Sequence, residues 1–580
     1  MPEITATVLL SFLMTGFTYV LFTYVFVHFL IVNGDNQKRK NVQHNNKHHK
    51  SKNNQKSISN VSNQKSNNHH HQNSNKKLIM NNKKLFYTPV SSVTNNTITR
   101  SNNNNVSVVF STLPKGTKPL PGPTPIPVIG NLHQLSDPLH MTFNQMALKF
   151  GPIFKINLGN NKVLVVLNDY KVANELLDQN EIYQPCDSIL GVKSISPSMR
   201  TIAQQALSPK IIESNYLPII CKESINLARH FYKNAGILIN PVDELTRSIS
   251  KTFSLITFGH SAEKFSLDFM EFLESANALE QKEIQIESLQ FLRKISSTQQ
   301  TLENKVHLSK SKYAEISKQL VDNLKKQATA TNVTSDKCFT AEILKSMKPK
   351  NEKEFINLSS NLLFDGIENT LAELKWVFVL LSYAPQVQHK IMQELSRVVE
   401  KGKFPNVKDY ANLHYLRATV KEIMRFRPVG FFSQPHIVTK NDVYQGYHIP
   451  QNANVIFNTN TLHFNQALFE RAKRFSPERY LDEQGRLKQN PKSAEIWMFG
   501  KGPNASISEY LTEITLSAIV AHTLSLFIIT PEIDETTGDE KEINMEGVSN
   551  GFKLNTPPNY SVIFELRKDV DHEKVFKENY

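Results

Sequence analysis

The chain has 580 residues, a formal net charge of +14 at pH 7 and three cysteines. This length exceeds one small domain, and three widely spaced cysteines without a CxxC pair indicate neither a disulfide framework nor a zinc site. Thirteen Lys or Arg against one acid lie in residues 33–110, so the later residues are nearly balanced, which excludes a strongly basic nucleic-acid-binding domain.

The first predicted element is an apolar segment. Residues 8–32 contain no Asp, Glu, Lys or Arg and are long enough to cross a bilayer as a helix. Glu3 before the segment and the bulky residues at its end favour a retained anchor over a cleaved signal peptide or a buried core helix, which are the alternatives. Because Lys38, Arg39 and Lys40 follow the segment, the positive-inside rule predicts a single-pass membrane protein with the rest of the chain in the cytosol.

A low-complexity stretch follows the anchor. Asn, Lys, Ser and His dominate residues 33–112. So few apolar side chains cannot bury a core, which predicts a disordered, solvated spacer. Binding of acidic lipid or RNA by its basic residues is the alternative. The predicted domains are therefore 1–32 for the transmembrane anchor, 33–112 for the spacer and 113–580 for the folded domain.

The folded domain begins at a proline-rich connector, residues 120–127, which is stiff and extended. A short helix is predicted over 141–150, followed by a hairpin of residues 153–158 and 163–167. From about 170 to 400, apolar residues recur at three- and four-residue spacing, which predicts helices.

The later elements alternate between long helices and short strands. The predicted helices cover 354–381, 386–399, 413–426 and 508–527. The third ends before Pro428, because the residue before a proline resists helical geometry. The predicted strands are 443–447, 454–457, and a C-terminal hairpin of 552–554 with 560–564. This pattern predicts a mainly α fold with small β-sheets.

Two motifs in this part of the chain indicate an ion-pair network. Glu422 and Arg425 share one face of the predicted helix 413–426 and can therefore pair. Arg479 lies in the Pro-Glu-Arg sequence of residues 475–481. With the proline connector, these stretches resemble the ExxR and PERF motifs of the cytochrome P450 family. The resemblance implies that the three charged residues brace the core beneath a haem; the alternative is a surface ion pair, worth about 1 kcal/mol or less.

The resemblance extends to residues 365–370, which match the family's oxygen-activation stretch (A/G)-G-x-(D/E)-T-(T/S) at Gly366, Glu368 and Thr370. Asn369 stands where the family has a threonine that assists proton delivery. An amide is a poor proton relay, because it does not exchange donor and acceptor roles as a hydroxyl does. The resemblance therefore implies a catalytic site at Glu368, Asn369 and Thr370 that is altered and weakened.

Residues 497–508 align without gaps with the family's haem loop, F-G-x-G-x-R-x-C-x-G. Phe499 and Gly500 match this pattern. Asn504 replaces the basic residue that faces a haem propionate in the family, and Ser506 replaces the cysteine whose thiolate ligates the iron.

Another haem-contacting motif of the family, W-x-x-x-R, aligns with residues 196–200. Arg200 is kept there and the tryptophan is replaced by Ser196. The substitutions thus fall on positions that face haem in the family, whereas the bracing motifs persist.

The loss of the cysteine decides the expected chemistry. A thiolate pushes electron density toward haem iron and favours O–O cleavage. A serine hydroxyl is far less acidic than a thiol with a pKa of about 8.5, so it stays protonated near neutral pH and binds ferric iron poorly. No cysteine lies in the loop, and no metal ligand is predicted at the axial position of Ser506. Met498 or His463 as a substitute axial ligand is the weaker alternative.

Three functions follow from the resemblance. The leading prediction is a protein of the cytochrome P450 fold in the endoplasmic reticulum membrane that is inactive as a monooxygenase. It is expected to bind no thiolate haem and to take a small apolar ligand or act through protein contacts. The first alternative is a haem-dependent monooxygenase with serine or water as the ligand, which would need NADPH–P450 reductase as its electron donor. The second alternative is a membrane-tethered ligand-binding or interaction protein whose function resides in the spacer. A non-P450 helical protein would have to match five ordered motifs by chance.

Overall fold

The computed structural model describes residues 113–127, 129–136, 139–158, 162–177, 181–185, 196–260, 315–326, 337–346, 352–488, 496–501, 505–547 and 554–578. All of them belong to one compact unit of the chain. The predicted anchor at 1–32 lies outside the described residues, and so does the predicted spacer at 33–112. Among the helices that the structure describes, none combines the length and the apolar character needed to span a bilayer.

Most of the described residues are helical, as the apolar spacing predicts. The α-helices are α2 (Leu139–Phe150), α3 (Tyr170–Leu177), α4 (Pro197–Ala206), α5 (Pro209–Ile211), α6 (Leu217–Lys233), α7 (Val242–Phe258), α10 (Phe339–Ser346), α11 (Glu352–Ser382), α12 (Pro385–Val398), α13 (His414–Phe426), α14 (Thr459–His463), α15 (Glu509–Leu526) and α16 (His572–Glu578). Single turns of tighter or wider helix are η1 (Leu132–Gln134), η2 (Ile212–Tyr216), η5 (Asp409–Asn412), η6 (Pro477–Tyr480) and η7 (Trp497–Phe499). Residues 315–326 are also helical.

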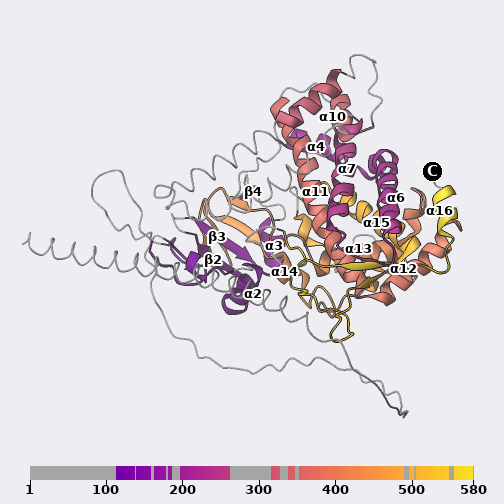
Figure 1. The fold of residues 1–580 in the computed structure, drawn as a ribbon. Coiled ribbons are helices and arrows are strands. Elements are labelled where there is room, and N and C mark those ends of the chain that lie inside the picture. Colours follow the sequence, from indigo (N-terminus) through magenta and orange to yellow (C-terminus); the bar gives the residue numbers. More distant parts are fainter. Residues whose placement is uncertain are drawn as a thin grey trace, which may run out of the picture. The chain divides into compact units, whose positions relative to one another are not determined.

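The long helix α11 lies at the centre of the main hydrophobic core. It packs against α7 and α15, and Figure 1 shows α7 running beside it. The contact with α7 is close at Gly366, where an added Cβ would overlap the buried ring of Phe253. This crowding is a physical reason for glycine at that point of the helix.

Three small sheets accompany the helices. The first has the order β2 (Ile153–Asn157), β3 (Val163–Leu167), β9 (Asn454–Phe457), β6 (His436–Val438) and β4 (Tyr183–Pro185). β3 and β9 are parallel and the other pairs are antiparallel. The second sheet is β1 (Lys118–Pro119), β8 (Tyr447–Ile449) and β7 (Asp442–Tyr444), and the third is β10 (Phe527–Pro531), β11 (Val562–Leu566) and β5 (Leu238–Ile239).

Two strand predictions were wrong. The single strand expected over 443–447 is a tight hairpin of β7 and β8, because Gln445 and Gly446 both adopt positive φ and reverse the chain. The strand expected at 560–564 begins two residues later, as β11, and it pairs with β10 and β5. Phe552 and Lys553, which belong to the predicted partner strand, lie outside the described residues.

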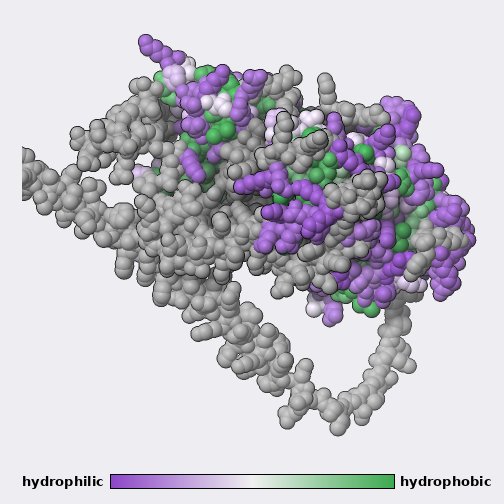
Figure 2. Space-filling model, turned by 90° about the horizontal axis from the view of Figure 1, so that it is seen from above, coloured by the Kyte–Doolittle hydropathy of each residue, from purple (hydrophilic) through white to green (hydrophobic). Residues whose placement is uncertain are grey.

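The surface of the described part is mostly polar on the face shown in Figure 2, where hydrophobic side chains appear as patches among hydrophilic ones. Such isolated apolar side chains are usual for a folded protein.

Candidate functional site

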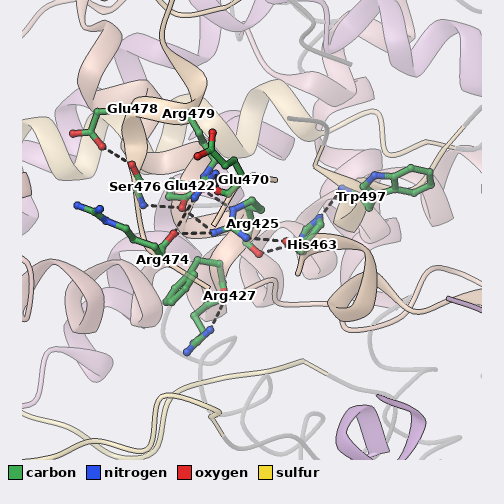
Figure 3. A network of polar contacts seen from close by, with 11 residues as sticks. Glu422, Arg425, Arg427, His463, Glu470, Arg474, Ser476, Glu478, Arg479 and Trp497 are labelled. Atoms are coloured by element: carbon green, nitrogen blue, oxygen red, sulfur yellow. Dashed lines mark hydrogen bonds and ion pairs between the residues drawn. The ribbon is translucent and has the colours of Figure 1, made fainter. Parts of the chain in front are cut away.

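The carboxylate of Glu422 holds two guanidinium groups in the interior (Figure 3). Both oxygens pair with Arg425 on the same helix, α13, at 2.7 and 2.8 Å. Arg479 lies in η6, and its Nε donates to Oε2 of Glu422 at 2.9 Å. The side chains of Glu422 and Arg425 are 0% exposed and that of Arg479 is 11% exposed. The three residues selected from the sequence are therefore in direct contact and buried.

Backbone groups satisfy the rest of this network. Oε1 of Glu422 also accepts the backbone N–H of Ser476 at 2.8 Å. The remaining guanidinium N–H groups donate to carbonyl oxygens at 2.8 to 2.9 Å, those of His463, Glu470 and Arg474. A buried ion pair is tolerated when its remaining hydrogen-bonding groups are satisfied in this way. The network ties α13 to the segment between α14 and η6.

His463 extends the network toward the segment that resembles a haem loop. Its Nδ1 donates to the carbonyl of Arg425 at 2.9 Å, and its Nε2 accepts the backbone N–H of Trp497 at 2.8 Å. Burial and the charge of Arg425 lower the pKa of His463 to about 3, so the ring is neutral. Both ring nitrogens are engaged, which leaves neither free to ligate a metal. This role of His463 could not be predicted from the sequence, because a lone histidine has no partner motif.

Described residues on either side of the loop make hydrogen bonds to Ser506. Gly500 ends η7 with a φ of 79°, a conformation that favours glycine. The carbonyl of Phe499 accepts the N–H of Ser506 at 2.6 Å, which closes the loop. The hydroxyl of Ser506 lies 2.9 Å from the hydroxyl of Ser508 and accepts the backbone N–H of Ser508 at 3.3 Å. Asn504 lies outside the described residues.

Arg200 comes to this loop from α4. Its Nη2 donates to the carbonyl of Ala505, the residue immediately before Ser506, while its buried Nε has no hydrogen-bond partner in the part of the chain that the structure describes. Ser196 caps the same helix, since its hydroxyl accepts the N–H of Met199 at 3.3 Å. The structure thus brings Arg200 and Ser506 together and gives the residue that replaces the family's tryptophan a capping role.

The residues of the oxygen-activation stretch lie in the middle of α11. Asn369 is exposed, Glu368 is half-buried and Thr370 is buried. The Thr370 hydroxyl has no hydrogen-bond partner among the described residues. One turn later stands Glu373, which sequence reasoning missed although it is an acid inside an apolar helical run. It is 0% exposed, and burial raises its pKa to about 8.

A model of the family described as Cytochrome P450 matches residues 120–560. The chain belongs to the cytochrome P450 family. The family resemblance read from the motifs is therefore confirmed, and with it a mainly helical P450 fold.

Curated relatives agree with the family assignment. The chain is 26% identical over 76% of its length to a cytochrome P450 monooxygenase of Hypocrea virens, of which 84% is covered. It is 25% identical over 76% of its length to steroid 17-alpha-hydroxylase/17,20 lyase of Ictalurus punctatus, of which 90% is covered. Cytochrome P450 2E1 of Rattus norvegicus is 26% identical over 76% of this chain, with 92% of that protein covered.

Membership of the P450 family implies a haem. A thiolate-bound haem needs a cysteine sulfur at the ligand position of the loop. The residue at the cysteine position is Ser506, and its hydroxyl already pairs with Ser508. Cys221 lies on α6 against Tyr410, and Cys338 is buried next to α10. Cys186 lies outside the described residues. The donor groups described around this loop therefore do not fit a thiolate-bound haem.

Proposed function

We propose that this chain is a cytochrome P450 that does not act as a thiolate-haem monooxygenase and instead takes up a small, largely apolar ligand. The observation that carries the proposal is the Ser506 hydroxyl at the ligand position, held by Ser508. A neutral hydroxyl is a poor ligand of ferric iron compared with a thiolate, because its proton is not lost near neutral pH. No step of oxygen chemistry is assigned to this chain.

The persistence of the scaffold supports a folded, ligand-binding protein over a decaying one. The buried network of Glu422, Arg425 and Arg479 is complete, and a partly satisfied network of this kind would cost stability. The substitutions at Asn369 and Ser506 lie elsewhere, at positions that serve oxygen and haem chemistry in the family.

The proposal includes attachment to a membrane. The apolar residues 8–32 and the basic residues that follow support a single-pass anchor, with the P450 domain in the cytosol at the endoplasmic reticulum. A partner that supplies electrons, such as NADPH–P450 reductase, is needed only for the alternative function below.

The test is a spectroscopic comparison of three purified proteins: the natural chain, Ser506→Cys and the matched control Ser508→Cys. We expect no stoichiometric haem and no thiolate-type carbon monoxide difference spectrum from the natural chain. Ser506→Cys should gain haem, whereas Ser508→Cys should not, since only the first places sulfur at the ligand position. Stoichiometric haem with turnover of an organic substrate by the natural chain would refute the proposal.

A second candidate is a haem monooxygenase in which Ser506 or water takes the place of the thiolate. It is favoured by one contact: the N–H of Ser508 points to the Ser506 hydroxyl and would stabilise developing negative charge there. In that case the natural chain would carry haem without a thiolate-type spectrum, and Ser506→Ala would lower its haem content.

A further inference from the structure

Two basic side chains flank the chain where it enters the proline-rich connector. Lys155 of β2 donates its backbone N–H to the carbonyl of Pro121 at 2.8 Å. Pro119, just before the connector, pairs with His448 of β8. A Cβ added at Gly122 would lie 3.4 Å from Cγ of Lys155, so the stem of this side chain packs beside the connector. The connector therefore brings Lys155 and His448 together from two different sheets.

Neither basic group has a partner in the part of the chain that the structure describes. No hydrogen bond or ion pair reaches the ammonium group of Lys155, although its side chain is half-buried. Nε2 of His448 is buried and unpaired, whereas Nδ1 of His448 and Nζ of Lys155 are not enclosed, so a ligand can reach them. Burial lowers the pKa of Lys155, and burial together with the charge of Lys155 lowers the pKa of His448.

Other half-buried lysines have acids beside them. Lys421 forms an ion pair with Glu513 at 2.7 Å. Burial lowers the pKa of Lys375, and two nearby acids oppose that shift. Among the described carboxylates, none has this effect on Lys155. Because a partly buried charge without a counter-ion is costly, an anion from outside the chain would be favourable beside Lys155.

The two groups suit a phosphate. Lysine binds phosphate as a point charge with three N–H donors, and a neutral imidazole adds one N–H. A phosphate ester carries about −1.5 to −2 charges at pH 7, and its tetrahedral oxygens can accept from both groups at once. Val443, the cross-strand partner of His448, is 51% exposed. An apolar side chain at this place suits an ester whose organic part is apolar.

We propose that Lys155 and His448 bind a phosphate group, with Lys155 as the charged contact and His448 as a hydrogen-bond donor. The ligand is a phosphate ester, either free or as the headgroup of a phospholipid. The site uses none of residues 497–508, so the inference goes beyond the proposed function.

The first test is a calorimetric titration of inorganic phosphate into the full chain, purified in a detergent that has no phosphate group. The natural chain is compared with Lys155→Met and with the control Lys118→Met, which removes an exposed lysine of β1. Phosphate should bind the natural chain and the control alike, and Lys155→Met at least about tenfold more weakly, since a charged hydrogen bond is lost. Acetate at the same ionic strength should bind more weakly than phosphate.

The second test presents the phosphate on a bilayer. The full chain is placed in nanodiscs of phosphatidylcholine, with and without phosphatidic acid, whose phosphate is a monoester. Phosphatidic acid should raise the midpoint of thermal unfolding more for the natural chain and Lys118→Met than for Lys155→Met, because a ligand that binds the folded state stabilises it.

The two tests together identify the source of the phosphate. A response to phosphatidic acid without affinity for inorganic phosphate would support a lipid headgroup, and the reverse would support a free ester. The site is overturned if neither probe acts, if the natural chain and Lys155→Met respond equally, or if acetate binds as tightly as phosphate.

A folding measurement separates binding from structure. In phosphate-free buffer, Lys155→Met should unfold at the same midpoint as the natural chain or a higher one, since it removes an uncompensated charge. A lower midpoint would show that the ammonium group has a partner within the fold, and would overturn the site. His448→Gln keeps an N–H donor and should retain more phosphate binding than His448→Leu; equal binding by the two would remove His448 from the site.

Discussion

Three acidic side chains lie in the interior of this protein, each with a different set of partners. Glu422 is fully paired by two arginines and a backbone N–H. Glu513 on α15 is likewise paired, with Arg417 and Lys421 of α13. Glu373 has a single backbone donor and no cation among its described contacts. Burial opposes ionisation of Glu513, but the charges of Lys421 and Arg417 lower its pKa overall, whereas burial raises the pKa of Glu373 to about 8 and leaves it neutral near pH 7.

Removing one partner of the Glu422 network should be strongly destabilising. Arg425→Met leaves the buried carboxylate of Glu422 with Arg479 and one backbone N–H as its partners, and we expect a loss of about 3 to 5 kcal/mol in the free energy of unfolding. Urea unfolding of the full chain measures this. Lys577→Met is the control, because Lys577 and Glu573 form a pair that is 79% exposed on both sides and should contribute nearly nothing. Equal effects of the two substitutions would show that the buried network is not stabilising.

The raised pKa of Glu373 makes a prediction about pH. The folded pKa is about 8 and the ordinary value is 4.5, so the folded state holds a proton that the unfolded state releases. The stabilisation of the folded state by this bound proton is complete below pH 4.5 and is lost as the pH rises through 8. The loss in the free energy of unfolding is on the order of a few kcal/mol. Between pH 5.5 and pH 8.5 the free energy of unfolding should therefore fall more for the natural chain than for Glu373→Gln. Parallel pH profiles for the two proteins would contradict a protonated Glu373.

Sequence reasoning succeeded at residues whose partners are fixed by spacing, and failed where a partner comes from elsewhere in the chain. Glu422 and Arg425 were found because i and i+3 positions share a helix face. His463 was weighed only as an alternative iron ligand, because its contacts to Arg425 and Trp497 depend on tertiary packing. Glu373 left a signal that was not used, an acid among Leu371, Ala372 and Leu374.

Among the elements, the helices were easier to predict than the strands. α11 and α13 matched their predicted ranges closely, since long apolar periodicity and the prolines at 385 and 428 define them. β10 was missed because its residues continue the apolar run of α15 without a break, and only its pairing with β11 makes it a strand. The turn at Gln445 and Gly446 was missed because glutamine seldom adopts positive φ.

The packing of α11 on α7 predicts a specific sensitivity at Gly366. Alanine is the better helix former by about 1 kcal/mol, but its Cβ would overlap the ring of Phe253, which is 1% exposed. Overpacking of a core costs about 1 to 3 kcal/mol, so Gly366→Ala should be destabilising overall. Gly430→Ala is the control, because its nearest contact would be the carbonyl of Phe432 at 3.6 Å. A gain in the midpoint of thermal unfolding for Gly366→Ala would show that the two helices can separate without cost.

On the scale of the whole molecule, the hydrophobic clusters of the described residues all lie between residues 120 and 576. The family match covers nearly the same interval, residues 120–560. The described core therefore lies in residues after 112, whereas the membrane attachment that we propose lies in residues 8–32.

This division predicts that the two properties can be separated. A chain that starts at residue 113 should unfold in urea at the same midpoint as the full chain, because it keeps every cluster of the described core. The full chain should sediment with membranes and be released by detergent but not by high salt, since an apolar helix rather than charge holds it there. A second truncation that lacks only residues 33–110 should still sediment. Sedimentation of the chain that starts at 113 would place the membrane contact in the folded domain, and a lower unfolding midpoint would show that residues before 113 take part in the fold.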